Sequence, residues 1–110
     1  MTIATKSAAA GVRGVTLLGS TGSIGVSTLD VIGRHRGRFR VVALTASTQV
    51  ERLFEQCQQF QPDYAVMQDA RAAQTLAGRL RAAGLAVQVL SGVDGLNTVA
   101  ALPSVHTVVA

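Results

Sequence analysis

The chain has very few aromatic residues. It contains one Tyr, three Phe and no Trp, although 48% of its 110 residues are hydrophobic. The apolar content is therefore mostly aliphatic, which is typical of the core of an α/β domain and argues against a disordered or fibrous chain. At this length we expect no more than one domain.

Cysteine and long apolar runs are also scarce. Cys57 is the only cysteine, so no disulfide can form within the chain, which suits a reducing compartment. No stretch reaches the 18 or more apolar residues of a membrane-spanning helix, and the opening MTIATKSAAAGVRG lacks the apolar run of a secretory signal. We expect residues 1–13 to be a flexible lead, followed by a domain over residues 14–110 that has no membrane partner.

Strand-like and helix-like segments alternate along the rest of the chain. Five alternations with short loops predict a doubly wound parallel sheet with helices on both faces, an α/β fold of the Rossmann-like type. The expected strands are residues 14–18, 40–45, 64–67, 86–90 and 105–109. The expected helices are residues 23–34, 50–60, 70–83 and 92–101. Because doubly wound sheets normally continue past a fifth strand, we expect this domain to be incomplete and the chain to be a fragment.

Two of the expected helices carry start signals. Thr48 is followed three residues later by Glu51, the spacing of a capping box, ahead of the helix over residues 50–60. Asp69 is placed to cap the helix over residues 70–83, and Gly84 is placed to end it.

Three glycines stand three residues apart in the segment LLGSTGSIGVSTLDVIG, residues 17–33. They follow an expected strand and open an expected helix, where free backbone N–H groups and the helix dipole favour a phosphate. Gly19 would permit a sharp turn, Gly22 would let a pyrophosphate approach the backbone, and Gly25 would allow close helix packing. Hydroxyl donors stand between them at Ser20, Thr21 and Ser23. This context favours nucleotide binding, and a purely structural turn is the alternative.

The end of the second expected strand indicates which nucleotide is bound. NAD enzymes usually carry an Asp or Glu there for the ribose 2′-OH, but residues 44–51, LTASTQVE, contain no acid before Glu51. Ser47, Thr48 and Gln49 offer neutral donors at a helix N-terminus, where a 2′-phosphate would meet no carboxylate. NADP is therefore favoured over NAD, and the alternative is that these residues only cap the helix.

Four arginines crowd into RHRGRFR, residues 34–40, in a chain of net charge +4. Such a cluster could bind phosphates or nucleic acid. It joins an expected helix to the next strand, and therefore lies at the amino ends of the strands, whereas ligands bind at the carboxyl ends. We expect a solvated loop and no nucleic-acid partner. His35 and His106 have no partners at metal-ligand spacing, so we single out no catalytic and no metal-binding residue.

Four segments of the chain resemble the 1-deoxy-D-xylulose 5-phosphate reductoisomerase family. The resemblance covers residues 15–110, in order and with similar spacing, and its most specific block is the glycine segment with STLDVI after it. The segments are GSTGSIGVSTLDVI at 19–32, FRVVALTA at 39–46, YAVM at 64–67 and VLSG at 89–92.

The resemblance implies the NADPH-binding part of an enzyme in the methylerythritol phosphate route to isoprenoid precursors. Such enzymes rearrange and reduce 1-deoxy-D-xylulose 5-phosphate to 2-C-methyl-D-erythritol 4-phosphate, with NADPH and a divalent metal, Mg or Mn. Positions that match the family's contacts to the cofactor phosphates are Thr21, Gly22, Ser23 and Ile24. Positions that match its segment around the 2′-phosphate are Ser47, Thr48 and Gln49, where a familiar version has Gly-Lys-Asn.

The resemblance also implies what this chain lacks. The family's metal ligands and sugar-phosphate residues would fall after Ala110, so the chain alone is expected to bind no metal and to be inactive. The short N-terminus does not suit a plastid transit peptide, which favours a bacterial, cytoplasmic protein, and we expect a homodimer at full length.

Two other functions stay open from the sequence. Another NADP-dependent epimerase or a semialdehyde dehydrogenase would need a catalytic Tyr/Lys pair or a nucleophilic cysteine. Tyr64 has no lysine near it in sequence, since Lys6 is the only one, and Cys57 falls on the apolar face of its helix. A stand-alone nucleotide-sensing domain is the second alternative.

Overall fold

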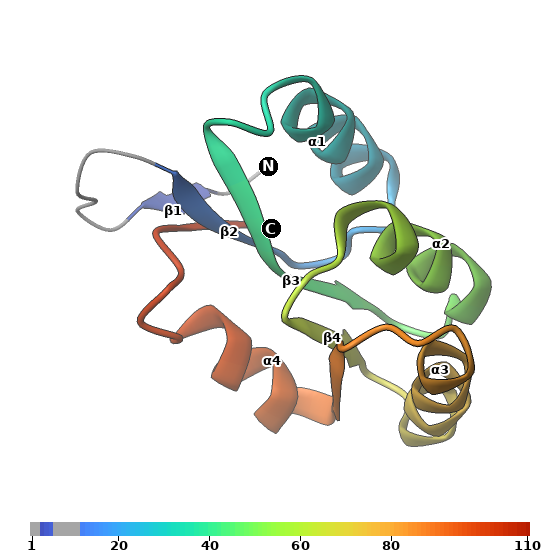
Figure 1. Ribbon diagram of the computed structural model, residues 1–110. Helices are drawn as coiled ribbons and strands as arrows, with labels where there is room; N and C mark the ends of the chain where they lie inside the picture. The colour runs from blue at the N-terminus through green and yellow to red at the C-terminus, as the bar shows by residue number, and fades with distance from the viewer. Residues whose placement is uncertain (1–2, 6–11) are drawn as a thin grey trace.

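The computed structural model describes residues 3–5 and 12–110, which form a single sheet with helices on both faces (Figure 1). Five strands run parallel, and their order in the sheet is β6-β2-β3-β4-β5. The direction of winding reverses between β2 and β6, which confirms the predicted doubly wound α/β fold. The parallel strands are β2 (Arg13–Leu17), β3 (Phe39–Ala46), β4 (Tyr64–Met67), β5 (Gln88–Ser91) and β6 (Thr107–Val109).

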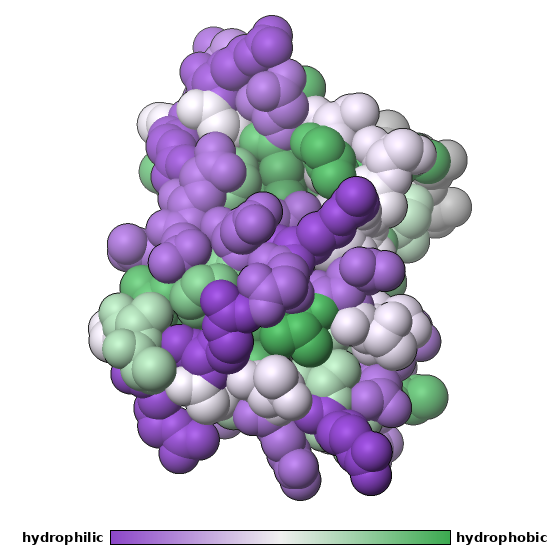
Figure 2. Space-filling model, turned by 90° about the vertical axis from the view of Figure 1, so that its right-hand side faces the viewer, coloured by the Kyte–Doolittle hydropathy of each residue, from purple (hydrophilic) through white to green (hydrophobic). Residues whose placement is uncertain are grey.

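Helices cover the sheet unequally. Three lie on one face and the fourth, α4, lies on the other (Figure 1). The face that carries the three helices is largely hydrophilic, with hydrophobic surface visible between the polar side chains (Figure 2). The helices are α1 (Ser23–Arg34), α2 (Val50–Phe60), α3 (Ala70–Ala82) and α4 (Gly92–Ala100). Among the described residues, no helix has the length and hydrophobicity needed to cross a membrane.

The apolar core is split by the sheet into two clusters. The larger one lies under α1, α2 and α3 and includes Leu29, Leu53 and Leu76. The smaller one, under α4, joins Val99 to Val66 and other strand residues. Strand β3 is buried throughout residues 41–46 because helices cover both of its faces.

The structure adds one strand that the sequence analysis did not predict. Strand β1 (Ile3–Thr5) pairs antiparallel with β6 at the edge of the sheet. It lies within residues 1–13, which we expected to be a flexible lead. The remainder of that segment, apart from residues 12 and 13, lies outside the described residues.

The predicted capping box is wrong. Helix α2 has Gln49 as its N-cap, with no hydrogen bond from a capping side chain, and Thr48 contributes only its backbone oxygen, which accepts from Val50 N at 2.9 Å. Glu51 therefore falls at the second helical position, one short of the position that a capping box requires. The other two signals are confirmed: Asp69 accepts from Ala72 N at 2.8 Å, and Gly84, with φ +72°, follows the end of α3.

Candidate nucleotide-binding site

A cavity of about 250 Å³ lies where the direction of winding reverses. It is lined by the carboxyl ends of β2 and β6 and by the start of α1. Open α/β sheets bind their ligands at this position, outside the carboxyl ends of strands on either side of the reversal. Gly19 and Gly22, the two ends of residues 19–22, which we call the glycine turn, form part of its wall.

Two of the three glycines are required by the fold. Gly19 has φ +77°, a backbone conformation that residues other than glycine rarely adopt. A Cβ on Gly25 would lie 2.5 Å from the carbonyl oxygen of Gly19, which is too close for any side chain. The predicted roles of Gly19 in the turn and of Gly25 in close packing are both confirmed.

The third glycine, Gly22, has no such requirement. Its φ of −76° suits any residue, and a Cβ there would meet nothing closer than the Gly19 oxygen at 3.5 Å, an ordinary contact. Gly22 is exposed and borders the cavity. The absence of a side chain at Gly22 is therefore not needed for packing within the protein. It leaves the backbone accessible from the cavity, where a ligand could reach it.

The start of α1 is open to an anion. Gly22 is its N-cap and has no side chain to cap the helix, and the first turn contains no acidic residue. The first intrahelical bond runs from Val26 N to Gly22 O at 2.9 Å, and Gly22 N donates back to Gly19 O at 3.2 Å. The N–H groups of residues 23–25 therefore have no partner within the helix. Their partial positive charge would stabilise a phosphate group bound there.

The end of β3 holds the glycine turn in place. Gly19 N donates to Thr45 Oγ1 at 2.8 Å, and Ser20 N donates to Thr45 O at 2.8 Å. Ser20 is fully buried, and its hydroxyl donates to Gln56 Oε1 at 2.7 Å. The expectation that Ser20 would offer its hydroxyl to a ligand is therefore wrong, because that proton is used inside the protein.

The second group of predicted residues, Ser47, Thr48 and Gln49, follows β3 at the same edge of the sheet. All three are exposed, but none lines the cavity beside β6. The nearest acid in sequence, Glu51, pairs with Arg79 of α3. Of the first group, Gly22, Ser23 and Ile24 line the cavity, and Thr21 does not. The structure thus places the two groups after neighbouring strands, where an elongated nucleotide could touch both.

The arginine cluster, residues 34–40, lies at the amino ends of the strands, opposite the candidate site, as predicted. Arg13 N, at the start of β2, donates to Arg38 O at 2.8 Å. Arg34 pairs with Asp30, and Arg40 pairs with Asp63, whose hydrogen bond raises the pKa of the Arg40 guanidinium. Two of the four arginines at the amino ends of the strands thus form ion pairs with nearby carboxylates.

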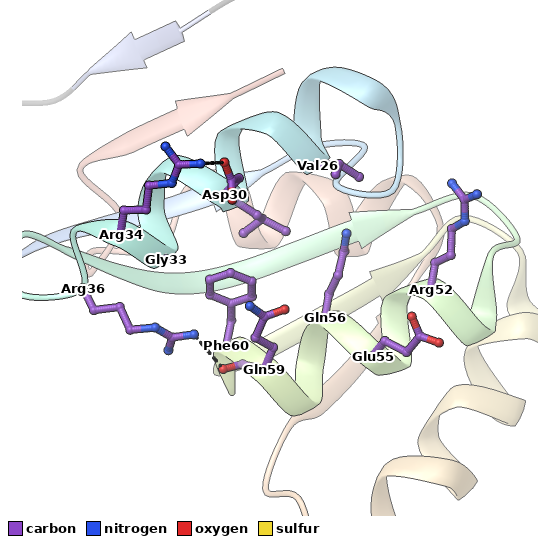
Figure 3. Close-up of a pocket in the computed structure, with 11 residues that line it drawn as sticks. Val26, Asp30, Gly33, Arg34, Arg36, Arg52, Glu55, Gln56, Gln59 and Phe60 are labelled. Atoms are coloured by element: carbon purple, nitrogen blue, oxygen red, sulfur yellow. Dashed lines mark hydrogen bonds and ion pairs between the residues drawn. The ribbon is translucent and has the colours of Figure 1, made fainter.

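A larger cavity, of about 680 Å³, lies between α1 and α2 (Figure 3). Its walls mix charged and apolar side chains, with Arg34 paired to Asp30 at one side and Phe60 on the opposite wall. It runs along the helices away from the sheet's carboxyl edge, except at one end, where Arg52 and Gln56 reach the glycine turn. We therefore assign nucleotide binding to the smaller cavity.

The two histidines and the cysteine have no arrangement suited to catalysis or metal binding. His106 Nδ1 accepts from Gly14 N at 2.9 Å, a bond that links the residue before β6 to the start of β2 and that the sequence analysis missed. Burial raises the pKa of the Cys57 thiol to about 12, so the thiol stays protonated and unreactive. Within residues 3–5 and 12–110, no three His, Cys, Asp or Glu side chains are close enough to hold a metal ion.

Comparison with known proteins identifies relatives along nearly the whole chain. The family model described as 1-deoxy-D-xylulose 5-phosphate reductoisomerase matches residues 15–110. The protein of that name from Nitrosomonas europaea is 61% identical over 98 residues, which are 89% of this chain and 24% of the relative. The one from Nitrosospira multiformis is 60% identical over 99 residues, 90% of this chain and 25% of the relative.

Solved structures agree with the sequence matches. The enzyme from Zymomonas mobilis in complex with NADPH superposes with a TM-score of 0.78 at 39% identity, over 84% of this chain and 24% of that one. A DOX-P reductoisomerase in complex with magnesium superposes with a TM-score of 0.82 at 34% identity, over 86% of this chain and 23% of that one. The chain thus spans about a quarter of the length of these relatives. It belongs to the 1-deoxy-D-xylulose 5-phosphate reductoisomerase family.

Proposed function

We propose that residues 14–110 form the NADPH-binding part of a 1-deoxy-D-xylulose 5-phosphate reductoisomerase. The observation that carries the proposal is Gly22, a glycine that neither backbone conformation nor packing requires, at the uncapped start of a helix. A side chain there would occupy the space through which a pyrophosphate approaches the helix N–H groups. A relative of known structure binds NADPH, and the same chemistry suits this site.

The two groups of residues would bind different parts of the cofactor. The residues proposed to hold its phosphates and adjoining groups are Thr21, Gly22, Ser23 and Ile24. The residues proposed to surround the 2′-phosphate are Ser47, Thr48 and Gln49. Hydroxyl and amide groups replace a lysine there, so the 2′-phosphate would be bound by hydrogen bonds and the dipole of α2 rather than by a point charge.

The complete reaction belongs to the full-length protein. NADPH, when bound, supplies the hydride that reduces the rearranged sugar phosphate. The residues of this chain bind the cofactor and orient it by fixing its phosphates. The described residues do not fit a divalent metal, so other parts of the protein would hold the metal.

Substrate, assembly and location are further parts of the proposal. The relatives are bacterial enzymes named for 1-deoxy-D-xylulose 5-phosphate, and we infer the same sugar-phosphate substrate, a cytoplasmic location and a homodimer at full length. The alternatives from the sequence are a different NADP-dependent enzyme and a nucleotide-sensing domain. Family membership speaks against the first.

Calorimetric titration of NADPH into the protein tests the central claim. We expect saturable binding of one NADPH per chain, and weaker binding of NADH because that nucleotide lacks the 2′-phosphate. A protein that is folded by circular dichroism and releases no heat with either nucleotide would contradict the proposed function.

A further inference from the structure

The glycine turn is supported from α2 as well as from β3. Gln56 Nε2 donates to Ser20 O at 2.9 Å, and Ser20 Oγ donates to Gln56 Oε1 at 2.7 Å. One side-chain amide therefore makes two bonds to one residue of the turn, which fixes the orientation of the amide. Ser20 is fully buried and Gln56 is half-buried, so these bonds are shielded from competing water.

A second side chain of α2 reaches the next residue of the turn. Arg52 lies one helical turn before Gln56, on the same face of α2, and both side chains extend from α2 on the side of α1 (Figure 3). Arg52 Nη1 donates to Thr21 O at 3.4 Å. Two successive carbonyl groups of the turn thus accept hydrogen bonds from side chains of one helix.

These bonds lie on the side of the turn away from the candidate nucleotide site. Helix α2 follows β3, on one side of β2, whereas the cavity lies on the other side of β2, toward β6. With the Ser20 and Thr21 carbonyls held toward α2, the backbone that follows is fixed as it enters α1. The bonds therefore determine where the N–H groups of Ser23 and Ile24, at the start of α1, are presented.

We propose that Gln56 is a positioning residue for the cofactor-binding turn, acting through Ser20, with Arg52 as a second support. This inference rests on the proposed function, because it assigns Gln56 to the pyrophosphate end of the same site. A turn that is held in its binding conformation before the ligand arrives loses less conformational freedom on binding. Loss of Gln56 should therefore weaken NADPH and NADH equally, because both share the pyrophosphate.

The test compares Gln56→Ala with Gln58→Ala in the natural protein at its full length. Gln58 is an exposed glutamine of the same helix for which the structure gives no side-chain bond, so its truncation changes the helix in the same way without touching the turn. Hydrogen exchange of the amides in residues 19–25 is measured without cofactor, and calorimetry gives the affinities for NADPH and NADH.

We expect Gln56→Ala to speed amide exchange in the glycine turn and to weaken both nucleotides by roughly tenfold, the effect of losing one or two hydrogen bonds of ordinary net strength. The ratio of NADPH to NADH affinity should not change, and Gln58→Ala should change neither exchange nor affinity. If Gln56→Ala does not fold, Gln56→Met replaces it, because methionine keeps a side chain of similar length, adds no charge near the phosphates and cannot donate to Ser20 O.

The outcomes separate this inference from the proposed function. A Gln56 variant that melts earlier but keeps the parent's exchange and affinities, measured well below its melting temperature, would show a merely structural role and overturn the inference. A parent protein that binds neither nucleotide would overturn the proposed function, while faster exchange in residues 19–25 of the variant would still support the positioning of the turn.

Discussion

A Cβ on Gly25 would lie 2.5 Å from the carbonyl oxygen of Gly19. The first turn of α1 therefore lies directly on the turn that leaves β2, and only a residue without a side chain fits between them. Gly22, midway between these two residues in the sequence, has free space beside it. The regular spacing of the three glycines thus combines two structural roles with a third position that the fold leaves open to a ligand.

Gly25→Ala should destabilise the protein because its methyl group would overlap the backbone of the glycine turn. We expect the free energy of unfolding to fall by about 1–3 kcal/mol, the usual cost of overpacking. Gly78→Ala is the matched control, because Gly78 lies in α3 and a Cβ added there would meet no atom within 4 Å. Alanine at this position should raise the free energy of unfolding by roughly 0.5–1 kcal/mol. Urea denaturation measures both. A Gly25→Ala variant as stable as its parent would contradict the close contact.

Gly22→Val should remove cofactor binding and leave the fold intact. Its backbone, at φ −76° and ψ 171°, suits a β-branched residue, so we expect less than about 1 kcal/mol of lost stability from the change of N-cap. The isopropyl group would stand where the pyrophosphate approaches α1. Calorimetry with NADPH checks the loss, and circular dichroism checks the fold. Unchanged affinity would mean that the glycine turn has only a structural role.

Ser47→Asp should weaken NADPH more than NADH. A carboxylate at the N-terminus of α2 would repel the 2′-phosphate. Repulsion between two charges at close range in water costs about 1 kcal/mol or more, so the affinity for NADPH should fall by a factor that approaches ten. Ser47→Asn, neutral and of the same size as the aspartate, is the control and should bind both nucleotides much as the parent does. Equal loss for both nucleotides would place Ser47 away from the 2′-phosphate.

The sequence predicted the parallel strands, the four helices and the roles of Gly19 and Gly25, because each depends on a local pattern of apolar and glycine residues. The unpredicted features join residues far apart in the chain. Ser20 and Gln56 are separated by 36 positions, and Gly14 and His106 by 92. No local pattern reveals such a pair, since it forms only when the sheet brings distant segments together.

The stability of the fold should fall in alkaline solution partly through Cys57. Burial raises the pKa of its thiol from 9.0 to about 12. Between these values the unfolded chain releases the proton while the folded chain keeps it, so the unfolded state is favoured as the pH rises. The loss would reach at most about 4 kcal/mol. Cys57→Ala should show a flatter decline of unfolding free energy from pH 9 upward, whatever its stability at neutral pH. Parallel declines in the two proteins would contradict the buried, protonated thiol.

The 110-residue chain alone should bind NADPH without oxidising it. Reduction of a sugar phosphate needs a group that stabilises the developing oxyanion, which a divalent metal would supply in this family. The carboxylates here are largely committed elsewhere: Asp69 caps α3, and three others pair with arginines, namely Asp30, Glu51 and Asp63. The described residues contain no cluster that could hold a metal.

Adding 1-deoxy-D-xylulose 5-phosphate and manganese to the chain should therefore leave the absorbance of NADPH constant, whereas the protein at its full natural length should consume it. The Gly22→Val variant at full length is the control, since it should lose turnover through loss of the cofactor alone. Measurable turnover by the 110-residue chain would mean that the oxyanion is stabilised by its own residues.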